Sequence, residues 1–142
     1  MAVFYAGAYG HTRAAALLLA DELRARGCEA VTVTDLARCD MAEAVEDAFR
    51  YDRLALASIT YNGDVFPFMR EFLHELSERA FQNRAVGLME NGSWAPAAAK
   101  QMRALLAPCK NLTFAPTTVT VRSAPDDAAR AQIKALAAEL WP

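Results

Sequence analysis

The sequence predicts an α/β fold in which one domain, residues 1–142, holds a five-stranded parallel sheet between two layers of helices. Three observations predict it. Short apolar segments alternate with helical ones along the whole chain of 142 residues. The first apolar segment, AVFYA at residues 2–6, is uninterrupted, as in a strand that is buried on both faces. A later segment, EAVTVTD at residues 29–35, alternates apolar and polar residues, which is typical of an edge strand.

The first half of the chain predicts three strands, each followed by a helix. The strand at residues 2–6 leads into a helix over 12–27, which Gly27 ends just past a basic last turn. The strand at residues 29–35 is followed by a short helix, DMAEAVEDAF, at 40–49. The third strand is RLALAS at residues 53–58. The helix after it starts at Pro67, where proline suits a first helical turn, and carries its apolar residues on one face.

The second half predicts two more strand–helix pairs. RAVGLME at residues 84–90 is the fourth strand, and the helix at 95–106 has Pro96 near its start. The fifth strand lies in TFAPTTVTVR, and the last helix lies in residues 123–140, where Ser123 followed by Asp126 matches a capping signature. Five such pairs with right-handed crossovers give a parallel sheet with helices on both faces. The common doubly wound order for five strands is 2-1-3-4-5.

Composition excludes several classes of function. The formal net charge is −2, from 15 basic and 17 acidic residues. This charge balance does not indicate the basic surface that binding to nucleic acid requires. No apolar stretch approaches the roughly 20 residues that span a bilayer, so we expect no membrane insertion. The apolar start lacks the charged lead of a signal peptide. Three cysteines without a C-x-x-C pair indicate free thiols in a reducing, cytoplasmic setting.

The predicted strand order places a ligand site between strands 1 and 3, beyond their carboxyl ends. The loops after strands 1, 3 and 4 come together there. They read GAYGHT, SITYNGDVFP and ENGSWAP, and each contains glycine, small hydroxyl or amide residues, and a large aromatic residue. The loop after strand 2 lacks this composition.

The first loop has the features of an anion-binding site. Gly7 and Gly10 let consecutive backbone N–H groups turn inward, the next helix adds its N-terminal partial charge, and Thr12 offers a hydroxyl. A plain glycine-containing turn would give the same pattern, so both interpretations stay open on this loop alone. The P-loop and dinucleotide glycine patterns do not match. Nor does the loop hold a cysteine nucleophile or the acidic pair of a response-regulator receiver.

The other two loops each carry one large aromatic residue, Tyr61 and Trp94. Aromatic faces stack on flat conjugated rings, and backbone groups in TYNG and NGS can read a ring edge. Together with the first loop, they indicate a ligand with a phosphate at one end and a flat, partly apolar ring at the other. Ordinary packing remains the alternative for either aromatic residue taken alone.

The three loops resemble those of flavodoxins, and more closely those of the flavodoxin-like domain of A-type flavoproteins (flavodiiron proteins). The family pattern Ser-x-Tyr/Trp-Gly-Asn-Thr corresponds to GAYGHT, with Gly7 in place of the hydroxyl residue and His11 in place of Asn. Ser-Pro-Thr-x-Asn followed by Phe-Pro corresponds to SITYN and then Phe66-Pro67. The Trp after a Ser/Gly run corresponds to Trp94, although Pro96-Ala97 replaces a common glycine pair. The resemblance covers almost the full chain.

The resemblance implies a flavodoxin-like three-layer sandwich that binds FMN, with the phosphate in the first loop and the isoalloxazine between the other two. The implied cofactor-binding residues are Ala8, Tyr9, Gly10, His11, Thr12, Ser58, Thr60, Tyr61, Asn62, Gly63, Asn91, Gly92, Ser93 and Trp94. No catalytic residue or metal ligand is implied. Only two histidines are present, too few for a diiron site, so the family's diiron chemistry would need a partner or another domain.

The sequence therefore predicts an FMN-binding electron-transfer domain that exchanges electrons with redox partner proteins or a diiron domain. Two alternatives stay open: an NAD(P)H-dependent FMN reductase of quinone-like acceptors, and a flavin-free binding module with the same shape. Asp64 and Glu90 lie near the expected ring in sequence and no Lys or Arg does. We expect this acidic setting to disfavour a reduced, anionic flavin and to lower its potential.

Overall fold

The sheet in the computed structural model, which describes residues 1–7, 10–92 and 95–142, confirms the predicted strand order. Five parallel strands lie in the order β2 (Thr32–Asp35), β1 (Ala2–Ala6), β3 (Arg53–Tyr61), β5 (Arg84–Asn91) and β6 (Leu112–Val121). The alternating segment does form the edge strand β2. A sixth strand that the sequence did not predict, β4 (Asp64–Val65), pairs antiparallel with the end of β3.

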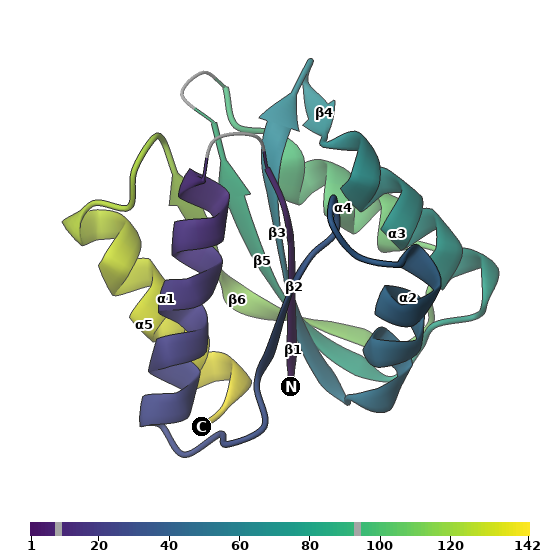
Figure 1. Ribbon diagram of the computed structural model, residues 1–142, viewed down its shortest axis with the longest axis horizontal. Coiled ribbons are helices and arrows are strands. Elements are labelled where there is room, and N and C mark those ends of the chain that lie inside the picture. Colours follow the sequence, from purple (N-terminus) through teal and green to yellow (C-terminus); the bar gives the residue numbers. More distant parts are fainter. Residues whose placement is uncertain (8–9, 93–94) are drawn as a thin grey trace.

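Helices cover both faces of the sheet, as Figure 1 shows. One face carries α1 (His11–Ala25) and α5 (Asp127–Leu140). The other carries α2 (Met41–Arg50), α3 (Pro67–Glu78) and α4 (Ala98–Leu106). The result is the three-layer α/β sandwich expected from the sequence. Among the described helices, none is long and apolar enough to cross a bilayer.

The central strand β1 divides its side chains between two buried clusters, one on each face of the sheet. Val3 and Tyr5 belong to the cluster under α1 and α5. Phe4 belongs to the cluster under α2, α3 and α4, where its ring lies 4.6 Å, centroid to centroid, from that of Phe72. Because successive side chains of a strand point to opposite faces, a strand covered on both sides must be apolar throughout. This explains the uninterrupted apolar run.

Local signals set most element boundaries. Gly27 has a positive φ of 101° and follows α1, and the N–H of Cys28 donates to the Leu23 carbonyl at 3.0 Å, which closes the helix as predicted. The capping prediction for α5 was wrong. Asp126 itself is the N-cap and accepts the Ala129 N–H at 2.8 Å. Pro125 disfavours helical backbone at the residue before it, so the helix starts later than Ser123.

Candidate functional site

The carboxyl ends of four parallel strands surround one cavity of about 300 Å³. It lies where the predicted crevice was expected, beyond β1, β3 and β5, and the loop after β6 also reaches it. The residues lining it are His11, Thr12, Ile59, Thr60, Asn91, Gly92, Arg122 and Ser123. Five of the predicted cofactor-binding residues therefore share one cavity: His11, Thr12, Thr60, Asn91 and Gly92.

The N-terminus of α1 opens at this cavity. Gly10 precedes the helix with a φ of 85°, in the left-handed region, and no side chain of the described residues caps the helix start. The first intrahelical bond runs from the Ala14 N–H to the Gly10 carbonyl at 2.9 Å, so the N–H groups of residues 11–13 precede the helical ladder. Such N–H groups and the helix dipole favour an anion.

Gly7 is required by the packing of the first loop. A Cβ built at Gly7 would lie 2.7 Å from Thr12 Oγ1 and 2.8 Å from Thr12 Cβ, closer than any real contact. The Thr12 side chain thus fills the space beside Gly7, where it is only 3% exposed. Its hydroxyl accepts a hydrogen bond from the Asn91 amide at 3.4 Å, which joins the start of α1 to the end of β5.

Two predicted hydroxyls hold neighbouring loops in place. Ser58 is fully buried, and its Oγ accepts the Phe66 N–H at 3.1 Å, just before α3 begins. Thr60 Oγ1 accepts the N–H groups of Ala97 and Ala98 at 3.0 and 3.2 Å. Thr60, which lies in β3, therefore caps α4, the helix that follows β5. The same residue also lines the cavity.

Glu90 completes the cap of α4. Its Oε1 accepts the Ala99 N–H at 3.0 Å, and its Oε2 accepts the Thr120 hydroxyl at 2.9 Å. A carboxylate at a helix N-terminus is stabilising because it meets the positive end of the helix dipole. Glu90 consequently links α4 to the neighbouring strand β6.

The second predicted loop is a tight β-hairpin. Thr60 pairs with Val65 and Tyr61 with Asp64, which leaves Asn62 and Gly63 as the two turn residues. Their φ values of 52° and 76° are both positive, as a type I′ turn requires, and Asn-Gly is the preferred pair for it. The hairpin carries β3 beyond the end of the sheet.

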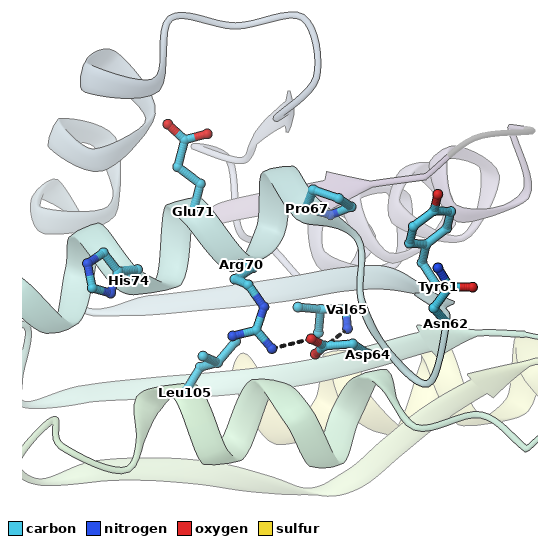
Figure 2. Close-up of a pocket in the computed structure, with 9 residues that line it drawn as sticks. All are labelled: Tyr61, Asn62, Asp64, Val65, Pro67, Arg70, Glu71, His74 and Leu105. Atoms are coloured by element: carbon cyan, nitrogen blue, oxygen red, sulfur yellow. Dashed lines mark hydrogen bonds and ion pairs between the residues drawn. The ribbon is translucent and has the colours of Figure 1, made fainter.

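Tyr61 and Asn62 line a second cavity, of about 550 Å³, on the α3 side of the hairpin. Figure 2 shows them at one end of it and His74 at the other. Tyr61 is 49% exposed, and its ring meets Phe66 edge-to-face at 5.7 Å. The structure thus places these two side chains next to the 300 Å³ cavity but in a separate hollow. Their contact with a flavin stays a prediction.

The charged residues around the site include two arginines, Arg70 and Arg122. Asp64 pairs with Arg70 (Figure 2). Although burial acts to raise the pKa of Asp64, hydrogen bonds from Arg70 and from the Val65 N–H and the charge of Arg70 outweigh it and lower that pKa. Arg122 lines the 300 Å³ cavity. A basic side chain that was not counted near the three loops thus lies at this cavity. The acidic setting expected around the flavin ring stays a prediction.

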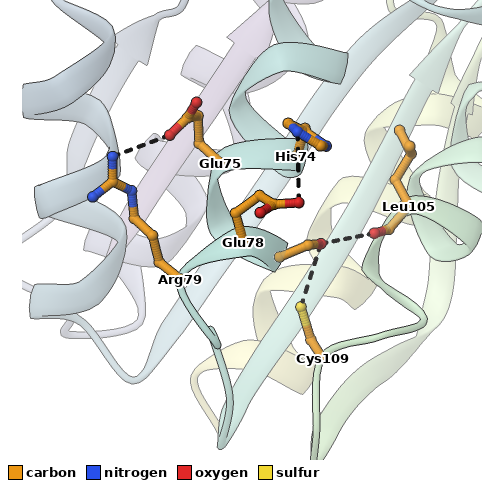
Figure 3. Close-up of polar contacts among 7 residues, drawn as sticks. His74, Glu75, Glu78, Arg79, Leu105 and Cys109 are labelled. Atoms are coloured by element: carbon orange, nitrogen blue, oxygen red, sulfur yellow. Dashed lines mark hydrogen bonds and ion pairs between the residues drawn. The ribbon is translucent and has the colours of Figure 1, made fainter.

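The outer face of α3 carries ordinary surface ion pairs. Figure 3 shows His74 with Glu78, at 3.7 Å, and Arg79 with Glu75, at 3.1 Å. His74 is on the solvated helix face that its acidic neighbours indicated. The Ser77 hydroxyl of the same helix donates to the Leu105 carbonyl at 2.9 Å. Within the described ranges, no group of three His, Cys, Asp or Glu residues is arranged to hold a metal ion.

Sequence reasoning missed three residues of the cavity: Ile59, Arg122 and Ser123. The signal for the last two was available, because the predicted order puts the loop after the last strand beside the loop after the fourth. The main-chain bond from the Gly92 N–H to the Val121 carbonyl, 3.0 Å long, makes this contact. Four predicted residues, Ala8, Tyr9, Ser93 and Trp94, lie outside the described residues, and Gly63 sits at the hairpin tip.

Comparisons with known proteins agree with this architecture. Residues 2–121 match a family model described as a flavodoxin domain. The structure superimposes on rubredoxin oxygen:oxidoreductase from Desulfovibrio gigas with a TM-score of 0.90 and 22% identity, over 98% of this chain and 34% of that one. For the flavodiiron protein from Giardia intestinalis, the TM-score is 0.82 with 20% identity, over 98% and 34% of the two chains. Oxidised flavodoxin 2 from Bacillus cereus gives 0.83 and 19%, over 98% and 95%.

The lengths of these relatives differ in an informative way. This chain spans about a third of the Desulfovibrio gigas and Giardia intestinalis proteins but nearly all of the Bacillus cereus flavodoxin. The identities are low, so the superpositions establish the shared fold. A search of curated proteins found no match.

Proposed function

The chain belongs to the flavodoxin domain family, and we propose on that premise that it binds FMN and shuttles electrons between a reductase and an acceptor protein or domain. One observation carries the proposal. The ends of four parallel strands meet at one cavity beside the uncapped N-terminus of α1. In open α/β sheets this is the place where ligands bind, and a helix N-terminus there favours a phosphate.

The residues present fit FMN. The cavity of about 300 Å³ lies at the lower end of the range for small-molecule sites. Its lining residues include Asn91, Ser123 and Arg122, and an amide, a hydroxyl and a guanidinium are groups that suit a hydroxylated, anionic tail. Gly92 keeps the loop after β5 close to Thr60, because a Cβ there would lie 3.3 Å from the Thr60 side chain.

Bound FMN would supply the redox chemistry, since flavins accept and release electrons, whereas the protein supplies position and electrostatics. The residues of this chain hold the surrounding elements in position. Thr60 and Glu90 fix the loop after β5 by capping α4. Ser58 fixes the entry to α3. The proposed site is thus held by side chains that are already satisfied by hydrogen bonds, which favours a preorganised cavity.

The partners are part of the proposal. We expect the electrons to come from a reductase and to pass to a redox protein or to a diiron domain, on another chain or elsewhere in the same protein. The two family relatives that are about three times as long as this chain motivate the second possibility. A reducing, cytoplasmic setting fits the three cysteines, which all lie in the described ranges and are free thiols.

Flavin binding is tested by titrating the purified chain with FMN and following the quenching of flavin fluorescence. We expect saturable binding with one FMN per chain. Gly92→Val, which adds bulk at the cavity wall, should weaken binding at least tenfold. Ala131→Val adds similar bulk beside the groove between α1 and α5 and should leave binding unchanged. No quenching by the unsubstituted chain would refute the proposal and favour the flavin-free module.

Electron transfer is tested separately on the FMN-loaded chain. Reduction by a flavodoxin reductase with NADPH, followed by reoxidation by a protein acceptor, is the expected result. Steady-state turnover of a quinone with NADPH and without any added reductase would instead identify the chain as an FMN reductase.

A further inference from the structure

The loop after β6 brings a cation to the cavity. Arg122 and Ser123 follow directly on β6 and line the cavity together with His11 and Thr12 at the start of α1. The hydrogen bond from the Gly92 N–H to the Val121 carbonyl fixes the beginning of this loop beside the loop after β5. The backbone therefore places residue 122 at the cavity wall whatever its side chain is.

Arg122 is also the single strongly basic group among the described residues that line this cavity, and no carboxylate of that set faces it. Within residues 1–7, 10–92 and 95–142, its guanidinium has no hydrogen-bond or ion-pair partner. Two acids at the ends of adjoining elements have partners of their own: Glu90 accepts from Ala99 and Thr120, and Asp126 accepts from Ala129. The neighbouring 550 Å³ cavity differs, because its Arg70 is paired with Asp64.

At its described residues, the first loop offers an anion the backbone N–H groups at the start of α1 and the side chain of His11, but no Lys or Arg side chain. Residue 7 has no room for a side chain, since a Cβ would meet Thr12 at 2.7 Å. The Thr12 hydroxyl is buried and contacts the Asn91 amide. A dianionic phosphate at this cavity consequently meets one full positive charge of a strong base, at residue 122.

We infer that Arg122 is the residue that makes the site select a phosphorylated flavin over riboflavin, by pairing its guanidinium with the phosphate. The inference rests on the proposed function and deepens it, because it assigns the discrimination to one side chain from the loop after β6. An arginine fork donates two hydrogen bonds to a phosphate, and charge-assisted bonds of this kind are among the strongest in proteins.

The test compares the dissociation constants of FMN and riboflavin, measured by fluorescence quenching at low and moderate salt, for the unsubstituted chain and for Arg122→Gln. The variant should raise the FMN constant about tenfold to hundredfold, the range for a charge-assisted hydrogen bond. It should change the riboflavin constant less than about twofold, because riboflavin lacks the phosphate. Arg122→Lys keeps the charge and loses the fork, so its FMN constant should lie in between.

The matched control is Arg130→Gln, which removes the same charge from an exposed arginine of α5 that does not line this cavity. It should leave both constants unchanged. Equal weakening of FMN and riboflavin by Arg122→Gln, or an unchanged FMN constant, would overturn the inference while the proposed function stands. If the unsubstituted chain binds neither flavin, the proposed function fails first and takes this inference with it.

Discussion

The helices α1 and α4 start at the same edge of the sheet but in opposite ways. α1 begins after Gly10, and no side chain of the described residues caps it. α4 also lacks a cap of its own, but Thr60 and Glu90 from neighbouring strands accept the N–H groups of Ala97, Ala98 and Ala99. One helix start is thus left to face the cavity, and the other is closed by the protein. We infer from this difference that a helix N-terminus can serve as a ligand site only where the fold leaves its N–H groups without acceptors.

Thr60→Val removes the hydroxyl that caps the N-terminus of α4, and it should have the largest effect on stability. Valine has nearly the same shape but cannot accept the two N–H groups at the start of α4. We expect the free energy of unfolding in urea to fall by about 2 kcal/mol, as for partly buried N–H groups that lose their acceptor. Thr60→Ser keeps the acceptor and should cost much less. An unchanged urea midpoint for Thr60→Val would show that water closes this helix equally well.

Gly10→Ala tests the open end. At Gly10 the φ is 85° and a Cβ would meet nothing within 4 Å, so the expected loss is backbone strain alone, about 1 kcal/mol. Gly27→Ala is the matched control at the other end of α1, with a φ of 101° and equally open surroundings. Both should lower the urea midpoint similarly, but only Gly10→Ala should weaken FMN binding. Equal effects of both on binding would show that the start of α1 has no special role.

Glu90→Gln separates charge from hydrogen bonding at α4. The amide oxygen can still accept the Ala99 N–H, and the amide NH2 can donate to the Thr120 hydroxyl in place of the bond that Glu90 accepts, so the main loss is the carboxylate charge at the helix start. We expect a destabilisation of about 0.5 kcal/mol that fades at high salt. A loss of the size expected for Thr60→Val, unaffected by salt, would mean that the link to Thr120 matters more than the charge.

Asp64→Asn should have the smallest effect, and it depends on pH. Asp64 and Arg70 steady the hairpin that presents Thr60 to α4. Because the pKa of Asp64 is lowered in the folded chain, its stabilisation is present above the ordinary value of 3.8 and is lost as pH falls through the folded value. Both side chains are about a third or more exposed, so we expect less than about 1 kcal/mol at pH 7. A stability difference from the native chain that persists at pH 2 would contradict this.

The fold could be predicted because its signals are local and repeated. The apolar run of β1, the alternation of β2 and the glycine after α1 each depend on a few neighbouring residues. The short strand β4 was missed because two residues on each side of Asn62-Gly63 are too few to show a strand period, although the pair itself is a strong hairpin signal. Proline accounts for part of the late starts of α4 and α5, since Pro96 and Pro125 disfavour helical backbone at Ala95 and Ala124.

The position of the site could be predicted from topology, but the tasks of its side chains could not. The strand order brings His11, Thr60 and Asn91 to one cavity. That Thr60 caps a helix 37 residues further along the chain depends on three-dimensional distance, which no sequence pattern records. Arg122 was missed for a different reason: charges were counted near three loops in sequence, and the loop after the last strand, which the predicted order also brings to this edge, was left out.

The close approach of Gly92 to Thr60 has a consequence for sequence change in this protein. A Cβ at residue 92 would lie 3.3 Å from both Cβ and Oγ1 of Thr60. A larger residue at 92 would press on the Thr60 side chain, and serine is the smaller residue at 60 that still keeps the hydroxyl that α4 uses. Residues 60 and 92 are therefore coupled, because a substitution at one changes the space that is available at the other. This coupling keeps the loop after β5 close to the end of β3.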